Sequence, residues 1–334
     1  MDTEGGAVVD TARKPVILVG GNMGRNDGVD YRAKLAEQFP EATFISVKGD
    51  PAALERQIGE ADAVIGGVPE RLLPRAARLR WVQTTGAGAD AVSTPAFAEA
   101  DIVATSAVGV HVASVPEQVL AMMLAFARRL PEQILNQHGE HRWYWPTGMF
   151  EVEGQTLGIL GFGHIGEALA RKARGLGMRV TAWRRSGRPA LEGLLDRQFV
   201  PDDLHGLLAD ADHVAIALPL TAETRGLIGA AELRAMKPTA YLYNVGRGPI
   251  VDTDALLAAL RDGTIGGAGL DVTDPEPLPP DHPLWDAPNL ILLTHYGGLT
   301  PKYGPRAYAI ISENVRRFLA GEELLNVVDK RRGY

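Results

Sequence analysis

Short apolar runs alternate along the N-terminal part of the chain with segments whose apolar residues recur at helical spacing. The predicted strands cover residues 16–19, 43–47, 63–65 and 81–84, and the predicted helices cover 31–38, 51–60 and 70–77. Strands that alternate with helices are typical of a parallel sheet, because each return to the same edge needs a crossover. The pattern predicts a first α/β unit that ends near Ala107.

A second α/β pattern begins at Gln155, after a long apolar helix predicted over 115–130 and an irregular stretch over 136–153. Its predicted elements are strands at 155–160, 178–183, 213–218, 240–244, 268–272 and 290–293, helices at 167–173 and 254–261, and a last helix at 306–319. We therefore expect an α/β protein of two doubly wound, Rossmann-like parallel-sheet domains with an active-site cleft between them.

Composition narrows the class of protein. At 334 residues the chain exceeds an ordinary single domain. It has no cysteine, which excludes disulfides and cysteine-based metal or nucleophile sites. Its net charge of −7 argues against a nucleic-acid or anionic-membrane surface, and no apolar run reaches transmembrane length. The acidic start lacks the basic and apolar regions of a signal peptide, so we expect a cytoplasmic protein.

A glycine motif follows the first strand of the second unit and opens a helix. The run Gly161-Phe162-Gly163-His164-Ile165-Gly166 matches the dinucleotide-binding pattern. In that pattern the first glycine makes a tight turn, the second admits a pyrophosphate and the third lets helix and strand pack. The helix N-terminus offers free N–H groups to the phosphates. A structural turn without a ligand is the alternative for such a motif alone, but here strand, turn and helix follow in the required order.

The residues after the next predicted strand should distinguish NAD from NADP. A free ribose 2′-hydroxyl needs an acidic residue there, whereas this chain has Arg184-Arg185-Ser186. Arginine has no acceptor for a hydroxyl but binds a 2′-phosphate through parallel N–H groups. We predict NADP(H) as the preferred cofactor, with NAD(H) or a solvated basic turn as the alternatives.

Three polar residues follow predicted strands of the second unit, at the sheet edge where doubly wound folds bind ligands. After the strands at 240–244, 268–272 and 290–293 come, in this order, Arg247, Glu276 and His295. Each alone is more often a solvated charge or a satisfied histidine. Together, in a nucleotide-binding unit, they form a set suited to carbonyl reduction, since imidazole titrates near working pH and arginine binds carboxylates.

These motifs, in this order, resemble those of the D-isomer-specific 2-hydroxyacid dehydrogenase family, and more narrowly its glyoxylate/hydroxypyruvate reductase branch. The resemblance extends from about Val16 to the last helix and rests on residues 81–90, 161–166, 244–248, 269–279 and 295–301. It implies a substrate-binding, flavodoxin-like domain over 14–110 plus 300–334 and a dinucleotide-binding Rossmann domain over 111–299. It also implies NAD(P)-dependent reduction of a small anionic 2-keto acid to the D-2-hydroxy acid, without a metal.

The resemblance further implies a role for each candidate residue. His295 is the general acid and base, Glu276 its partner and Arg247 the substrate clamp. The residues implied for the substrate carboxylate are Thr85, Gly86, Ala87, Gly88 and Arg247. The residues implied for the cofactor are Gly161, Gly163, His164, Ile165, Gly166, Arg184, Arg185, Ser186, Thr221, Val245 and, at the nicotinamide carboxamide, Asp271.

Other features leave alternatives open. Thr294 stands where the family often has proline, and Gly246 where it often has alanine or serine. The run Trp143-Tyr144-Trp145 predicts either packing at a hinge or subunit interface, or a lid that selects substrates. The resemblance implies a homodimer, because helices like the long apolar one from Val115 pair subunits in relatives. The alternative functions are a phosphite-type dehydrogenase and a non-catalytic dinucleotide-sensing scaffold that resembles corepressors on this fold.

Overall fold

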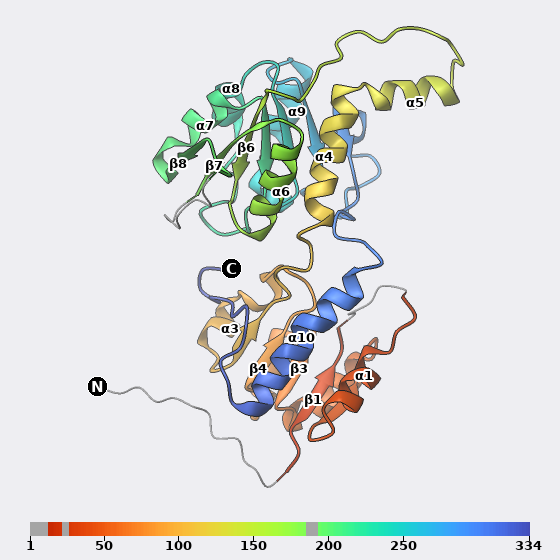
Figure 1. Cartoon of the computed structure of the whole chain (residues 1–334). Coiled ribbons are helices and arrows are strands. Elements are labelled where there is room, and N and C mark those ends of the chain that lie inside the picture. The colour runs from red at the N-terminus through yellow and green to blue at the C-terminus, as the bar shows by residue number, and fades with distance from the viewer. Residues whose placement is uncertain (1–12, 22–26, 185–192) are drawn as a thin grey trace. The chain divides into compact units, whose positions relative to one another are not determined.

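The computed structural model describes residues 13–21, 27–184 and 193–334, which form two compact units. One unit combines the chain up to His111 with Thr300–Tyr334, and the other is Val112–Leu299. Each unit contains one parallel sheet with helices packed against it (Figure 1). This arrangement confirms the predicted class, an α/β protein with two doubly wound sheets.

The first unit has a five-stranded parallel sheet in the order β2-β1-β3-β4-β5. Its strands are β1 (Val16–Val19), β2 (Thr43–Ser46), β3 (Ala63–Ile65), β4 (Trp81–Gln83) and β5 (Val103–Thr105). Its α-helices are α1 (Tyr31–Gln38), α2 (Pro51–Gln57), α3 (Pro95–Glu99) and α10 (Tyr303–Ala320). The order reverses between β1 and β3, the place where flavodoxin-like sheets bind ligands at the carboxyl ends of their strands.

The last helix of the chain, α10, completes the core of this unit. Its residues Ile311, Val315 and Phe318 are buried in one apolar cluster with Ile17 of β1 and Trp81 of β4. The rings of Trp81 and Phe318 lie 5.1 Å apart. One apolar face of this sheet is therefore covered by a segment that follows the sheet by about two hundred residues.

Buried polar side chains also link α10 to the sheet. Gln83 Oε1 accepts hydrogen bonds from Asn314 Nδ2 and Thr105 Oγ1, each at 2.8 Å. Trp81 Nε1 donates to Thr105 Oγ1 at 2.8 Å. All four residues are buried, where an unpaired polar group is costly. The network therefore fixes α10 relative to β4 and β5.

The second unit has a seven-stranded parallel sheet in the order β12-β11-β10-β9-β6-β7-β8. Its strands are β6 (Thr156–Leu160), β7 (Arg179–Trp183), β8 (Arg197–Phe199), β9 (His213–Ile216), β10 (Tyr241–Asn244), β11 (Gly267–Leu270) and β12 (Leu290–Leu292). Its α-helices are α4 (Ser114–Ala127), α5 (Leu130–His138), α6 (His164–Gly175), α7 (Leu204–Asp210), α8 (Ala230–Ala235) and α9 (Thr253–Arg261). The order reverses between β6 and β9, as in dinucleotide-binding Rossmann folds.

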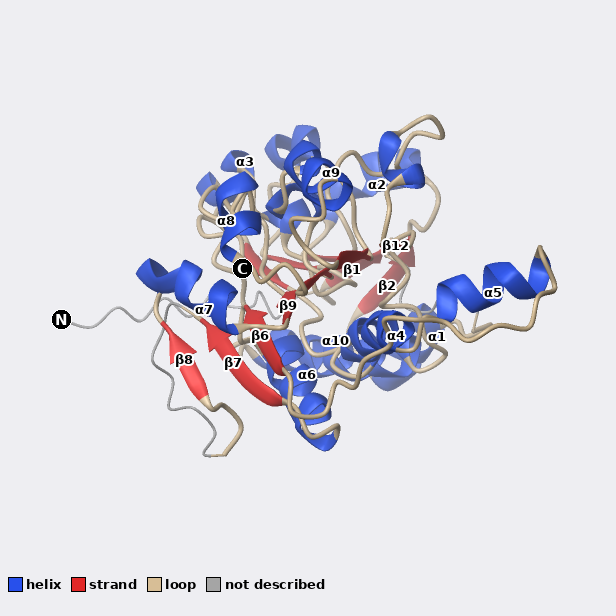
Figure 2. Cartoon of the chain, turned by 90° about the horizontal axis from the view of Figure 1, so that it is seen from above, coloured by secondary structure: helices blue, strands red, loops and turns tan. Residues whose placement is uncertain are grey.

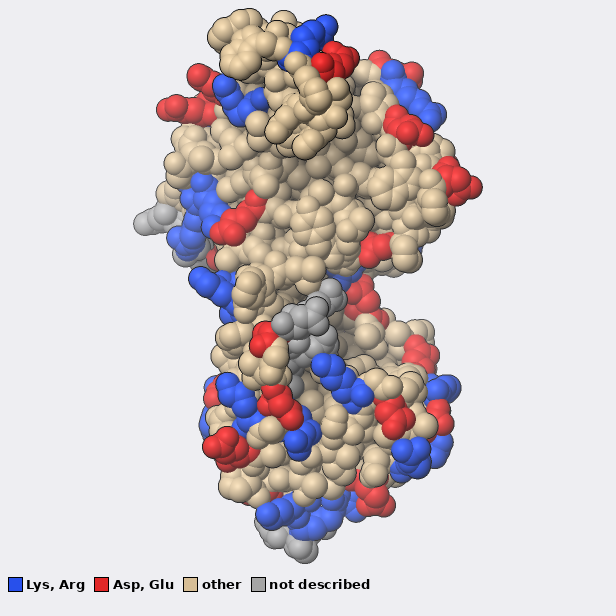
Figure 3. All heavy atoms as spheres, turned by 90° about the vertical axis from the view of Figure 1, so that its right-hand side faces the viewer, with Lys and Arg blue, Asp and Glu red and all other residues tan. Residues whose placement is uncertain are grey.

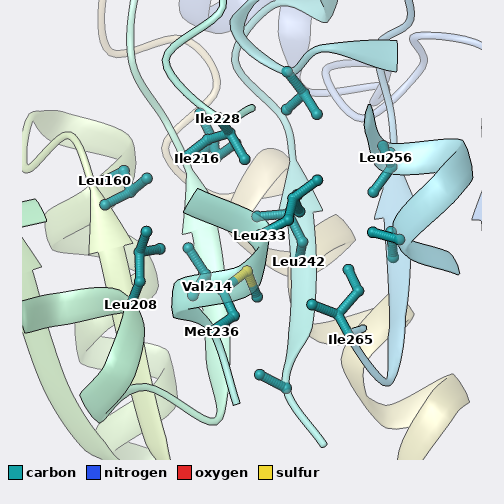
Figure 4. Packing of buried hydrophobic residues seen from close by; sticks show 14 of the residues in the cluster. Leu160, Leu208, Val214, Ile216, Ile228, Leu233, Met236, Leu242, Leu256 and Ile265 are labelled. Atoms are coloured by element: carbon teal, nitrogen blue, oxygen red, sulfur yellow. The ribbon is translucent and has the colours of Figure 1, made fainter. Parts of the chain in front are cut away.

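Two apolar clusters cover the two faces of this second sheet. On one face, Leu208 of α7, Leu233 of α8 and Leu256 of α9 pack with Val214 and Leu242 of the strands (Figure 4). On the other face, buried residues of α4 and α6 form a cluster with residues of the same sheet. Burial on both faces explains why these strands are continuous apolar runs in the sequence.

Two predicted helices are wrong in the structure, and two strands were not predicted. The helix predicted at 70–77 is a 3-10 helix over Glu70–Arg75, because Pro74 within it lacks an N–H group. The helix predicted at 115–130 ends at Ala127, and Arg129 takes a left-handed conformation with φ of 54° before α5 begins. Strands β5 and β8 are absent from the prediction, because three-residue strands carry almost no periodic signal.

Candidate active site

The glycine motif joins β6 to α6. Gly161 has a φ of +96°, and a Cβ there would lie 2.7 Å from the Ala217 carbonyl oxygen. A Cβ on Gly166 would collide with the Gly161 carbonyl oxygen, whereas a Cβ on Gly163 would meet no heavy atom of the described chain within 4 Å. Gly161 therefore serves the turn and Gly166 the contact between helix and turn. Gly163 leaves open space over the backbone.

The first turn of α6 contains backbone N–H groups that the helix itself does not use as donors. The helix begins at His164, and none of the side chains that the structure describes caps it. The N–H groups of His164, Ile165 and Gly166 lie in the first turn, where no intrahelical acceptor exists. Together with the helix dipole, these donors can bind an anion such as a pyrophosphate.

Arg184 follows β7, and only 9% of it is exposed. Its Nε donates to Gln198 Oε1 at 2.9 Å, and its guanidinium lies 5.8 Å from the ring centroid of Phe162 in the glycine motif. The guanidinium is therefore held at the carboxyl end of β7 beside that motif. Gln198 belongs to β8, a strand that sequence reasoning missed, and Arg185 and Ser186 lie outside the described residues.

Thr221 and Val245 follow β9 and β10. The Thr221 N–H donates to Thr224 Oγ1 at 2.8 Å, which closes a tight turn. Val245 is buried, and its N–H donates to the last residue of β9 at 3.2 Å. A Cβ on Gly246 would lie 2.7 Å from the Leu218 carbonyl oxygen. The loops after β9 and β10 therefore lie in close contact, which favours glycine at position 246.

Arg247 lies in the loop after β10 and is partly buried. Asn244 shapes this loop, since its Nδ2 donates to the Arg247 carbonyl oxygen at 2.9 Å and its Oδ1 accepts from the N–H two residues on at 3.1 Å. A Cβ on Gly248 would collide with the Thr273 carbonyl oxygen. The loops after β10 and β11, which carry Arg247 and Glu276, are therefore packed tightly together.

His295 and Glu276 form a hydrogen-bonded pair. The distance from Nδ1 to Oε1 is 2.6 Å, and the two side chains are 45% and 40% exposed. Because the carboxylate occupies Nδ1, Nε2 is the ring nitrogen that can face a ligand. His295 has a left-handed backbone with φ of 55°. A residue other than glycine adopts this conformation only where surrounding contacts enforce it.

The contacts that hold His295 come from Asp271. The Asp271 carbonyl oxygen accepts from the His295 N–H at 2.7 Å. Its carboxylate accepts from the N–H groups of Tyr296 and Gly297 at 3.2 and 3.1 Å. Burial raises the pKa of the Asp271 carboxyl, and the two N–H groups oppose that rise. Asp271 therefore positions the loop of His295, a role that the sequence did not indicate.

In the first unit, residues 85–88 form the loop after β4. The Thr85 carbonyl oxygen accepts a hydrogen bond from the Tyr303 hydroxyl at 2.6 Å. The Gly86 carbonyl oxygen accepts from Thr84 Oγ1 at 3.0 Å. Within the described chain, nothing accepts a hydrogen bond from the N–H groups of residues 85–88. This loop therefore offers backbone donors at the carboxyl end of its strand.

In the described residues, 13–21, 27–184 and 193–334, no three histidine or acidic side chains are grouped so that they could hold a metal ion. Among the helices of those same ranges, none combines the length and the apolar character needed to cross a membrane.

The chain is similar to known proteins over most of its length. Residues 120–297 match the model of a family described as D-isomer specific 2-hydroxyacid dehydrogenase, NAD binding domain. Glyoxylate/hydroxypyruvate reductase B of Pectobacterium atrosepticum is 38% identical to this chain, and the match covers 90% of this chain and 94% of the relative's length. Glyoxylate reductase of Thermococcus gammatolerans is 37% identical, over 95% of this chain and 96% of its own.

A solved structure supports the same assignment. The NADPH-dependent glyoxylate/hydroxypyruvate reductase of Sinorhizobium meliloti, in complex with NADP and sulfate, matches with a TM-score of 0.82 and 29% identity, over 96% of this chain and 100% of that chain. The family model covers more than half of this sequence, and relatives above 30% identity cover nearly all of it. The chain therefore belongs to the D-isomer-specific 2-hydroxyacid dehydrogenase family.

Proposed function

We propose that this protein reduces a small 2-keto acid such as glyoxylate or hydroxypyruvate to the D-2-hydroxy acid, with NADP(H) as the preferred cofactor. Family membership carries the coarser statement, an NAD(P)-dependent dehydrogenase of 2-hydroxy acids. The 2.6 Å pair of His295 and Glu276 is the observation that supports the reaction. This pair follows strands of the sheet that also carries Arg247 and the glycine motif. One sheet edge thus combines a proton donor, a cation and a dinucleotide-binding turn.

The residues at this edge fit a nicotinamide dinucleotide. The open backbone at Gly163 and the first-turn N–H groups of α6 would bind its pyrophosphate. Thr221 and Val245 would line its site. Asp271 would accept from the carboxamide, because a carboxylate has more acceptor positions than the two loop N–H groups use. When bound, the nicotinamide supplies the hydride for carbon 2 of the substrate.

The residues after β7 support NADP(H) over NAD(H). β7 is followed by Arg184, Arg185 and Ser186 and by no acidic residue that could accept from a ribose 2′-hydroxyl. The contact from Arg184 Nε to Gln198 orients the planar guanidinium, which suits phosphate recognition. The relative from Sinorhizobium meliloti was solved with NADP. A relative from Xanthobacter autotrophicus, 31% identical with a TM-score of 0.83, was solved with NADPH.

The chain's own side chains supply the proton and the substrate contacts. His295 donates the Nε2 proton to the carbonyl oxygen as carbon 2 gains a hydride, so the carbonyl becomes a hydroxyl. Glu276 accepts a hydrogen bond from the Nδ1 N–H and thereby keeps the ring in the orientation that this transfer needs. Arg247 binds the carboxylate and polarises the carbonyl. In the first unit, the backbone N–H groups of residues 85–88 are donors of the kind that bind a carboxylate.

The first test compares NADPH and NADH oxidation with glyoxylate in parallel. Faster turnover with NADPH supports both the reaction and the cofactor preference, whereas turnover with NADH alone refutes the preference. His295→Asn should lower kcat by about 100-fold or more, since it removes a general acid. His205→Asn, at an exposed histidine of α7, is the matched control and should leave kcat unchanged. Oxidation of phosphite without reduction of any 2-keto acid would overturn the proposal.

We also propose a homodimer formed through α5 and the segment after it. α5 has no buried residue and extends away from the rest of its unit (Figures 1 and 2). Leu135, Trp143 and Trp145 are 74%, 93% and 83% exposed. The segment contacts α5, since the Tyr144 hydroxyl donates to Glu132 Oε1 at 2.7 Å. Figure 3 shows few charged side chains in the middle of the face that this unit turns to the viewer.

Large exposed aromatic side chains grouped on one segment favour a partner surface. The partner proposed is a second copy of this chain. Light scattering after size exclusion should give twice the mass of the chain. The double variant Leu135→Ser/Trp143→Ser should give the mass of one chain. Val200→Ser, at a residue that is 56% exposed elsewhere in the unit, is the control and should stay dimeric. A monomeric wild type would contradict the proposal.

A further inference from the structure

A tyrosine outside the catalytic set contacts the loop proposed for the substrate carboxylate. Tyr303 is the first residue of α10, and its hydroxyl donates to the Thr85 carbonyl oxygen at 2.6 Å. The His111 ring stacks on the Tyr303 ring, with centroids 5.5 Å apart and an angle of 24° between the planes. All three residues belong to the first unit. An aromatic contact and a hydrogen bond therefore both hold the hydroxyl at the loop.

The hydrogen bond from Tyr303 to the Thr85 carbonyl oxygen affects the Gly86 N–H as a donor. The Thr85 carbonyl and the Gly86 N–H belong to one peptide group, and a hydrogen bond to the oxygen polarises the group and strengthens the N–H as a donor. The next peptide group joins the Gly86 carbonyl to the Ala87 N–H and is polarised in the same way. Its carbonyl oxygen accepts from Thr84 Oγ1 at 3.0 Å and from the Ala107 N–H at 2.9 Å. The N–H groups of Gly86 and Ala87 are therefore both polarised and fixed in direction.

The same two N–H groups are accessible to a ligand. Neither donates to any residue that the structure describes. A Cβ on Gly86 would meet no described heavy atom within 4 Å, and Gly86 and Ala87 are both partly exposed. Successive backbone N–H groups in fixed positions bind negative charge, as in an oxyanion hole. A small anion can therefore be bound by this stretch of backbone.

We infer that Tyr303 is a positioning residue for the substrate carboxylate: its hydroxyl fixes and polarises the peptide group whose Gly86 N–H binds the anion. The inference rests on the proposed function, which identifies the anion as a 2-keto acid. It predicts a specific kinetic signature. An N–H that binds the carboxylate equally in the ground state and the transition state changes KM and leaves kcat nearly constant.

Tyr303→Phe removes the hydroxyl and keeps the ring that stacks on His111. We expect the KM for glyoxylate to rise about 3- to 10-fold, with kcat and the KM for NADPH within about twofold of wild type. Tyr308→Phe is the matched control. It removes a hydroxyl hydrogen bond of the same length in the same helix, 2.6 Å to Gln38 Oε1 on α1, and should leave all three constants unchanged.

A second measurement does not depend on turnover. Oxalate, a dicarboxylate of about the substrate's size, is titrated into isotope-labelled protein while the amide resonances of Gly86 and Ala87 are followed. We expect both resonances to shift in wild type, and Tyr303→Phe to raise the oxalate Kd by the same factor as the KM. If wild type reduces no 2-keto acid, the proposed function fails, and the oxalate titration still tests the tyrosine.

Three results would overturn the inference. The first is a wild type in which oxalate shifts neither resonance. The second is a Tyr303→Phe variant with unchanged Kd and KM. The third is a Tyr303→Phe variant that loses kcat and thermal stability while its oxalate Kd stays constant, because the hydroxyl would then be structural only.

Discussion

His213 makes the stability of the second unit depend on pH. It is the first residue of β9, and only 1% of it is exposed. Its Nε2 lies 2.7 Å from Gln155 Oε1, and its Nδ1 lies 3.1 Å from the Tyr243 hydroxyl. Because a carbonyl oxygen can only accept, Nε2 carries the proton and Nδ1 accepts from the tyrosine. Burial lowers the pKa of His213 to about 4.

The size of the effect follows from the two states of the chain. An unfolded histidine has a pKa near 6.5, so between pH 6.5 and 4 the unfolded state binds a proton that the native state does not. His213 therefore does not change the free energy of unfolding above about pH 6.5, and it lowers that free energy as the pH drops toward about 4. A gap of about 2.5 pH units at about 1.36 kcal/mol each gives a loss of about 3 kcal/mol below pH 4, and about 2 kcal/mol at pH 5.

His213→Gln keeps a polar side chain at the site but cannot titrate. Between about pH 7.5 and pH 5, urea unfolding should show wild type losing about 2 kcal/mol more free energy of unfolding than this variant. His205→Gln, at a histidine side chain that is 59% exposed, is the control and should follow wild type. Equal pH dependence in wild type and His213→Gln would refute the buried neutral histidine.

Three further substitutions test other contacts. Gly166→Ala should raise the Kd for NADPH at least about tenfold, because its Cβ collides with the backbone of the glycine turn; wild-type affinity in a calorimetric titration would contradict this. Asn314→Leu should lower the free energy of unfolding by about 2 kcal/mol, because Gln83 loses a buried partner; an unchanged urea midpoint would argue against it. Glu276→Gln should lower kcat at least about tenfold with a constant KM for NADPH, because a neutral amide is a weaker acceptor than a carboxylate for the His295 Nδ1 N–H and holds the ring less firmly; a wild-type kcat would refute the pairing.

The parts of the fold that could be predicted have local causes. Gly161 is required by its own φ of +96°, and Gly166 is required by the nearby Gly161 carbonyl oxygen. Strands such as β6 are mostly apolar because both faces of the sheet are covered. β8 has neither a required glycine nor an apolar run. It is a three-residue edge strand for which β7 is the one partner within the described residues, and two of its residues are exposed. Its place in the sheet is determined by its neighbour rather than by its own sequence.

In the site, residue types could be predicted better than contacts. The resemblance predicts the pair of His295 and Glu276, and the structure brings the two side chains together. The support that Asp271 gives to the loop of His295 depends on N–H groups about 25 positions along the chain, which no local pattern indicates. The contact of Gln198 with Arg184 could not be predicted either, because it requires the position of β8.

The place of α10 has a consequence for synthesis on the ribosome. The second unit is one continuous segment and can fold as soon as it has emerged. The strands of the first unit emerge earlier, yet Ile311, Val315 and Phe318, which complete the core around Ile17 and Trp81, emerge last. At about 5–20 residues per second, the apolar face of the first sheet stays uncovered for roughly 10 to 40 seconds while Val112–Leu299 is made. The first unit is therefore the one whose apolar sheet face is exposed to aggregation for longest during synthesis.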